Sequence, residues 1–133
     1  MSDIQIFGIA SQQARWLSER QTVIASNLAN ASTPGYKAKD VVPFSSVLNG
    51  VQSGLSTTNS RHMNVNGSAG GVDSAGNART ATRTDPHGKT SHSGNSVSVE
   101  HELVKGSQVA GAYSLNTNIV KAFHRMLLMS VRS

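Results

Sequence analysis

The feature that most constrains this chain is a hydrophobic repeat near the N-terminus that stops at a Thr-Pro-Gly sequence. The repeat alternates steps of three and four residues, and only one of its members is polar. It consists of Phe7, Ala10, Ala14, Leu17, Gln21, Ile24, Leu28 and Ala31. This spacing is typical of a coiled-coil seam, a narrow apolar stripe by which one helix packs on another. It predicts a single helix over residues 2–31, which must bury one side.

The end of this helix is marked by Thr33, Pro34 and Gly35. Proline disfavours a helical conformation in the residue before it, and glycine can take the positive φ that a turn after Pro34 requires. Asn27 and Asn30 lie one helical turn apart just before this point. Their amides can either bind the free carbonyls of the last turn or reach a partner segment, and the sequence leaves both readings open.

A second long helix is predicted from Ser96 to Arg132. Ser96 or Ser98 can cap it, and Glu100 and Glu102 suit the positive end of the helix dipole. Its apolar stripe is broad and comprises Leu103, Val109, Ala110, Tyr113, Val120, Phe123, Met126, Leu127 and Val131, with Ile119 and Met129 beside it. We expect the two terminal helices to pack along each other, and the surplus apolar surface predicts association with further subunits.

The part between the helices divides in two. Residues 37–66 are interpreted as an extended arm, because Pro43 argues against a central strand. The arm contains four candidate docking residues and a short helical turn over residues 45–48. Those docking residues are Val42, Phe44, Val47 and Leu48. Residues 67–95 are rich in glycine and serine and are expected to be flexible.

The predicted fold is therefore mainly α. The N-terminal helix with its motif (1–36) and the C-terminal helix (96–133) form one coiled-coil-like unit, while the extended arm and a long flexible Gly/Ser-rich segment lie between them.

Composition limits what such a chain can do. Its 133 residues make one domain at most, and the hydrophobic fraction of 37% predicts a small core that needs partners. The absence of cysteine excludes disulfides and thiolate chemistry. The net charge of +5 is scattered along the chain, so nucleic-acid binding is weakly supported. No stretch has the length of a membrane span, and no cleavable signal peptide is expected.

An enzyme or metal site is not predicted. The five histidines lie mostly in the middle segment, and no pair of them has the helical spacing of a zinc site. No nucleophile elbow or phosphate-binding loop occurs in a strand–turn–helix setting. We therefore predict no catalytic, cofactor-binding or metal-binding residues.

Three sequence blocks resemble a known family. Residues 26–36, Ser-Asn-Leu-Ala-Asn-Ala-Ser-Thr-Pro-Gly-Tyr, are similar to the N-terminal signature of the axial proteins of the bacterial flagellum, which form its rod and hook. Thr58–Met63 and Gly94–Leu103 resemble pieces of its proximal rod proteins, and the short length fits them too. A second type of short rod protein also has the Asn-x-Ala-Asn pattern. The block around His62 favours the proximal rod type just described over this second type.

This resemblance implies a structural subunit without enzymatic activity in the periplasm-spanning rod of the basal body. It implies export through the flagellar type III apparatus without a cleaved signal peptide. It also implies contacts with other rod proteins and with the adaptor between rod and export gate. We expect the terminal helices to join subunits into the proximal axial tube that transmits torque. The residues predicted to carry subunit interaction are Phe7, Ala14, Leu17, Ile24, Asn27, Leu28, Asn30, Pro34, Gly35, Tyr36, Tyr113, Val120, Phe123 and Leu127.

An alternative from another class is a basic amphipathic helix on a membrane surface. Residues 118–129 have the composition for it, with basic and large apolar side chains interspersed. The seam in the first helix favours a helical partner instead, because a lipid surface does not require three-four spacing.

Overall fold

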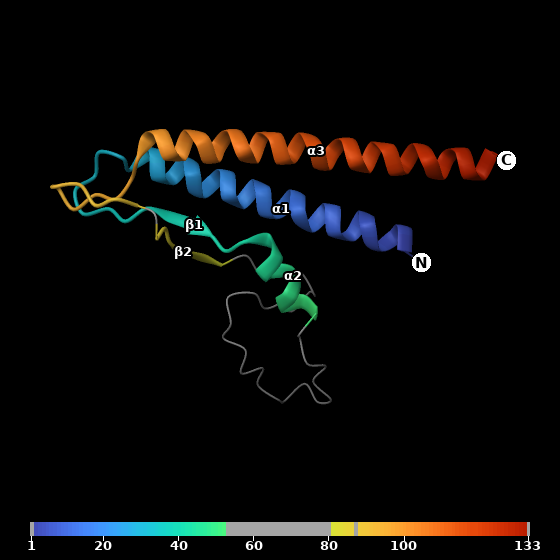
Figure 1. The fold of residues 1–133 in the computed structure, drawn as a ribbon, viewed down its shortest axis with the longest axis horizontal. Coiled ribbons are helices and arrows are strands. Elements are labelled where there is room, and N and C mark those ends of the chain that lie inside the picture. The colour runs from blue at the N-terminus through green and yellow to red at the C-terminus, as the bar shows by residue number, and fades with distance from the viewer. Residues whose placement is uncertain (1, 53–80, 87, 133) are drawn as a thin grey trace, which may run out of the picture.

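Two long antiparallel helices form the body of the molecule (Figure 1). The computed structural model describes residues 2–52, 81–86 and 88–132. Helix α1 spans Ser2–Ala29 and helix α3 spans Val99–Arg132. Their 28 and 34 residues correspond to about 42 and 51 Å. The mainly α fold with long terminal helices is therefore confirmed, although each helix is slightly shorter than predicted at the end nearest the motif.

The core lies between α1 and α3. Leu17 and Ile24 of α1 and Val109 of α3 are at most 6% exposed, and Trp16, Leu28 and Ala112 pack against them. Ala10 is also buried. Ala10, Leu17 and Ile24 are spaced by seven residues, so they are the same position of successive heptads. The other half of the predicted seam is less covered, since Ala14 is half-buried and Gln21 is exposed. Helix α3 thus covers one side of the α1 seam.

A small antiparallel sheet lies beside α1. Strand β1 (Lys39–Val41) pairs with β2 (Thr82–Thr84), with Asp40 opposite Arg83. Strand β1 falls in the predicted extended arm. Strand β2 falls within residues 67–95, a segment for which the sequence predicts no regular element. Its side chains are exposed, so its order comes from backbone pairing with β1 and not from burial.

Helix α2 spans Phe44–Gln52 and is longer than the predicted turn over 45–48. It begins directly after Pro43, whose carbonyl accepts hydrogen bonds from the backbone N–H groups of Ser46 (2.9 Å) and Val47 (3.3 Å). Proline has no N–H to lose at a helix start, which explains why it precedes a helix here. Of the four candidate docking residues, Val42 and Val47 are buried, and Phe44 and Leu48 are half-buried.

Several predictions fall outside the described residues. The Thr58–Met63 block and residues 67–80 of the segment predicted to be flexible belong to this part. In the described part of the chain, no helix is long and apolar enough to cross a membrane.

Candidate functional site: a polar network and the helix faces beside it

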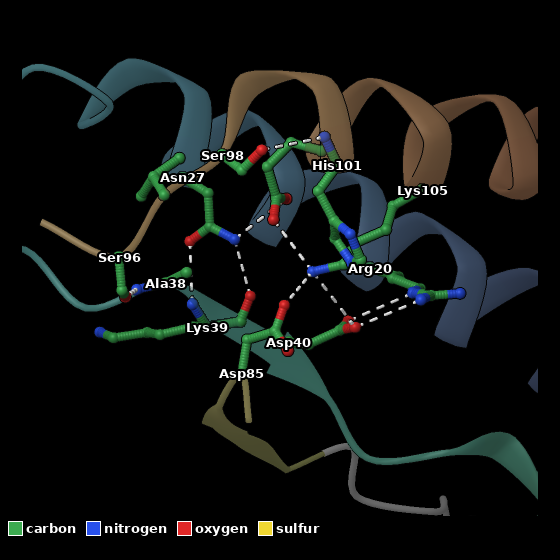
Figure 2. A network of polar contacts seen from close by, with 12 residues as sticks. Arg20, Asn27, Ala38, Lys39, Asp40, Asp85, Ser96, Ser98, His101 and Lys105 are labelled. Atoms are coloured by element: carbon green, nitrogen blue, oxygen red, sulfur yellow. Dashed lines mark hydrogen bonds and ion pairs between the residues drawn. The ribbon is translucent and has the colours of Figure 1, made fainter. Parts of the chain in front are cut away.

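Asn27 lies at the centre of a buried polar network (Figure 2). Its side chain is fully buried. The amide Nδ2 donates to the Lys39 carbonyl at 2.7 Å, and Oδ1 accepts from the Lys39 N–H at 3.1 Å. The side chain thereby makes the two hydrogen bonds that a neighbouring strand would make to β1. It closes the edge of β1 that faces away from β2.

The same side chain also reaches α3 and the turn after α1. Nδ2 donates to Glu102 Oε2 at 3.1 Å, and the Tyr36 hydroxyl donates to Oδ1 at 3.4 Å. Two donors and two acceptors are therefore all used, which is the full capacity of an asparagine amide. An aspartate could not replace it, because a carboxylate would have no hydrogen to donate to Lys39 or Glu102.

Lys105 of α3 forms the charged half of the network. Its Nζ donates to Glu102 Oε1 at 2.9 Å and to Asp85, and it lies 3.7 Å from Asp40 Oδ2. Arg20 of α1 binds the same Asp40 through two bonds of 3.2 Å. Burial opposes the positive charge of Lys105, but the hydrogen bonds to Asp85 and Glu102 and the charge of Asp40 outweigh it and raise its pKa. Among the described residues, no buried polar side-chain atom lacks a partner.

Asn95 binds the turn that follows α1, residues 30–36, which we call the corner. It is 5% exposed, and its Nδ2 lies within hydrogen-bond distance of the carbonyls of Asn30, Ala31 and Thr33, at 2.8–3.0 Å. These carbonyls follow the helix end and have no partner within the helix. Ser96 continues the contact, because its hydroxyl accepts from the Ala38 N–H at 2.8 Å.

Gly35 is the second element of this corner. It has a φ of 74° and donates its N–H to the Ser93 carbonyl at 3.0 Å. The positive φ predicted for the residue after Pro34 is thus present. A Cβ added to Gly94 would lie 3.4 Å from the Gly35 Cα, so the two backbones approach closely.

The residues predicted to carry subunit interaction divide into two groups. Those brought together within the chain are Leu17, Ile24 and Leu28 in the core, Asn27 and Tyr36 in the network, and Asn30, Pro34 and Gly35 at the corner. Asn30 donates to the Ser26 carbonyl at 2.8 Å, so it serves the helix end, whereas Asn27 crosses to other segments. The others are spread along the helices: Phe7, Ala14, Val120, Phe123 and Leu127 are half-buried, and Tyr113 is exposed.

Several residues of the network were not found from sequence. Glu102 was interpreted only as suiting the helix dipole and Lys105 was not singled out, yet they are 1% and 5% exposed. Asn116 was also missed, and it donates to the Ala10 carbonyl at 2.9 Å. A signal was present, because these three residues form one series on α3 with Val109 and Ala112, in steps of three, four, three and four residues. Polar members of such a series are candidates for buried, specifying positions.

Trp16 and Phe44 border a cleft of about 440 Å³ between α1, β1 and α3. The Trp16 indole donates to the Val42 carbonyl at 2.8 Å, and its ring centroid lies 5.9 Å from that of Phe44. The Arg20 guanidinium lies 5.5 Å from the Trp16 ring centroid. No group of His, Cys, Asp and Glu suited to a metal ion occurs among the described residues.

Comparison with known proteins identifies the family. Residues 16–37, which include the end of α1 and the corner, match the family model "Flagella basal body rod protein". The flagellar basal body rod protein FlgB of Agrobacterium fabrum is 41% identical over 137 residues, covering 99% of this chain and 96% of that protein. FlgB of Aeromonas hydrophila is 40% identical over 70 residues, covering 50% of this chain and 52% of that protein. The proximal rod resemblance of the sequence blocks is thus confirmed, and the chain belongs to the FlgB family of flagellar basal body rod proteins.

Proposed function

We propose that this chain takes its place in the proximal rod by packing the exposed faces of α1 and α3 against neighbouring subunits. As a member of the FlgB family, it is a structural component of the flagellar basal body rod. The observation that carries the proposal is the apolar surface of α3. Its exposed large side chains include Leu103, Val104, Tyr113, Leu115, Ile119, Met126, Leu128, Met129 and Val131. A lone subunit leaves this surface in water, and covering it favours assembly.

A groove between the helices offers a second contact surface. It measures about 730 Å³ and is bordered by Ala14 and Gln21 of α1 and by Gly106, Ala110 and Tyr113 of α3. Small residues on both sides let a third helix approach closely. Ala14 and Gln21 belong to the side of the α1 seam that α3 leaves uncovered, and both border this groove. A neighbouring helix placed in the groove would therefore complete the heptad packing of α1.

The buried network has an indirect role in this proposal. Leu17, Ile24 and Asn27 are already inside one chain. We assign them to holding α1, β1 and α3 as one body, so that force on one helix reaches the other without relative sliding. The residues that touch neighbours are then Phe7, Ala14, Tyr113, Val120, Phe123 and Leu127, which are half-buried or exposed in the single subunit.

Two further parts of the proposal come from family membership. We assign export to the flagellar type III apparatus, and we place the adaptor between rod and export gate among the partners.

Contacts that repeat from subunit to subunit without closing into a ring build a helical tube from identical or related subunits.

The proposal is tested with substitutions that spare the core. Leu115→Asp and Met126→Asp change side chains that are 61% and 49% exposed, so the isolated chain keeps its helix content. We expect both variants to be missing from purified basal bodies and to leave cells non-motile, because a carboxylate cannot be buried against a neighbour without a partner.

The matched control is Ser114→Asp, which adds the same charge to an exposed position of the same helix. Circular dichroism of the purified chains checks folding, and immunoblots of basal bodies measure incorporation. Normal amounts of the Leu115→Asp variant in basal bodies, together with normal swimming, would contradict the proposal.

A further inference from the structure

The exposed surface of α3 contains a regular stripe of its own. Leu115, Ile119, Ala122, Met126 and Met129 are separated by steps of four, three, four and three residues. All five are exposed, and the four large side chains are 41–61% exposed. We call these five residues the outer stripe. It is distinct from the inward series of α3, which includes Val109 and Asn116. Its three-four spacing fits a helical partner.

The charges beside the outer stripe all have one sign. With Ile119 and Met126 as a positions of a heptad, Arg125 and Arg132 both occupy g positions. Residues at e and g flank a helix–helix contact and select the partner by charge. No aspartate or glutamate follows Glu102 in the sequence, so α3 itself has no acidic group to pair with these arginines.

A second copy of the same stripe is a poor partner for this surface. In an antiparallel pair, g positions face g positions, which brings arginine against arginine. In a parallel pair, g faces e, and the e positions are held by Phe123 and Ser130. Neither arrangement supplies a carboxylate.

The rest of the chain has few acidic groups to offer. Asp40, Asp85 and Glu102 are already bound to Lys105 in the polar network. Among the side chains that the structure describes, the exposed carboxylates are Glu19 and Glu100.

We propose that the outer stripe of α3 binds an amphipathic helix of a different protein, one that carries glutamate or aspartate opposite Arg125 and Arg132. This inference rests on the proposed function and specifies the chemistry of one neighbour. Burial of the apolar side chains of the outer stripe supplies the affinity. The charges of Arg125 and Arg132 favour an acidic neighbour over other neighbours of similar shape.

Binding is tested with the full chain and three fluorescent helical peptides. Two peptides share one Leu/Ile heptad seam and differ only in having glutamate or lysine at e and g; the third is the chain's own segment 110–132. Fluorescence anisotropy gives the dissociation constants at low and high salt. We expect the glutamate peptide to bind about tenfold more tightly than the lysine peptide, with a preference that falls as salt rises. The own segment should resemble the lysine peptide.

Charge reversal supplies the specific test. The double variant Arg125→Glu/Arg132→Glu should reverse the preference between the two designed peptides. The control variant Lys121→Glu lies at a c position, away from the stripe, and should leave the preference as it was. Equal binding of both designed peptides, or tightest binding of the own segment, would overturn the inference. Arginine-dependent binding to phosphatidylglycerol vesicles without peptide preference would assign the stripe to a membrane instead, and so would overturn it too.

An assay in cells separates this inference from the proposed function. Replacing Ile119 by aspartate removes the apolar contact, whereas the double arginine variant changes only the choice of partner. Loss of basal-body incorporation with both variants supports both ideas. Loss with Ile119→Asp alone would leave the rod assignment intact and refute the acidic partner. Normal incorporation of Ile119→Asp refutes the use of this surface in assembly altogether.

Discussion

At the scale of single residues, the most consequential side chain is Asn27. It was singled out from sequence because it stands just before a Thr-Pro-Gly turn, but its partners could not be named. Those partners are Lys39 and Glu102, which are 12 and 75 residues away in sequence. Local patterns do not show which distant segments meet. The choice between serving the helix end and reaching a partner therefore needed the structure.

We expect Asn27→Ala to lower the free energy of unfolding by about 2–3 kcal/mol, since it leaves the part-buried backbone groups of Lys39 without their Asn27 partners. Asn27→Asp should be worse, because it places a carboxylate beside Glu102 and the Lys39 carbonyl. Asn30→Ala is the control and should cost about 1 kcal/mol, since it removes a more exposed bond to the Ser26 carbonyl. Urea denaturation measures all three, and an Asn27→Asp variant as stable as the parent would contradict this assignment.

Lys105 predicts an alkaline limit to stability. Its pKa is raised in the folded chain, so its contribution is complete below the unfolded pKa near 10.4 and is lost as pH rises through the higher folded value. Lys105→Met removes the positive charge that Asp85 and Glu102 contact in the network, whereas Asp40 keeps its ion pair with Arg20, and the change should cost about 3 kcal/mol at neutral pH.

The measurement is the urea midpoint of the parent and of Lys105→Met from pH 7 to pH 11.5. The difference in urea midpoint between the parent and Lys105→Met should narrow only above about pH 10.4. Lys121→Met, at an exposed position, shows the effect of losing a lysine without partners in the network. A gap that closes at neutral pH would show that the ion pairs do not stabilise the fold.

At the scale of elements, the helices were predictable and the sheet was not. The α1 seam and the proline–glycine stop located the first helix to within two residues of its end at Ala29. Strand β2 has three exposed residues, and its sequence, Thr-Arg-Thr, contains no apolar alternation. A strand of this kind exists because its partner is present. Single-sequence periodicity carries no information on that pairing.

Two glycines of α3 provide a test at this scale. An added Cβ at Gly106 or Gly111 meets nothing within 4 Å. Each change to alanine should therefore stabilise the isolated chain by about 0.5–1 kcal/mol. Gly106 borders the groove beside Ala14 and Tyr113, so Gly106→Ala should also weaken incorporation into basal bodies, whereas Gly111→Ala should not.

Thermal unfolding followed by circular dichroism gives the stability of both variants, and immunoblots of basal bodies give their incorporation. If Gly106→Ala is incorporated as well as Gly111→Ala, the groove does not receive a neighbouring helix.

At the scale of the whole molecule, the buried polar contacts are concentrated at one end. The sheet, the corner and the polar network all lie near the junction of α1 and α3, while Met126, Leu128, Met129 and Val131 at the far end of α3 are exposed (Figure 1). Tertiary packing supplies most helical stability in proteins, so the far end of α3 has little to hold it in a single subunit.

Hydrogen exchange at low protein concentration tests this asymmetry. The amides of Ala38 and Lys39, bound by Ser96 and Asn27, should exchange only with global unfolding. The amides of residues 126–132 should exchange faster by orders of magnitude. Equal protection along α3 would show that the far end is held within one subunit.

The position of the network in the sequence has a consequence for the order in which the chain folds. Asn27 and Ala38 can bind Glu102 and Ser96 only after these later residues are present, so a chain that has emerged only partly from a ribosome cannot make these bonds. Its N-terminal third would meanwhile present an uncovered seam. The nascent chain therefore depends on its last third to shield its first.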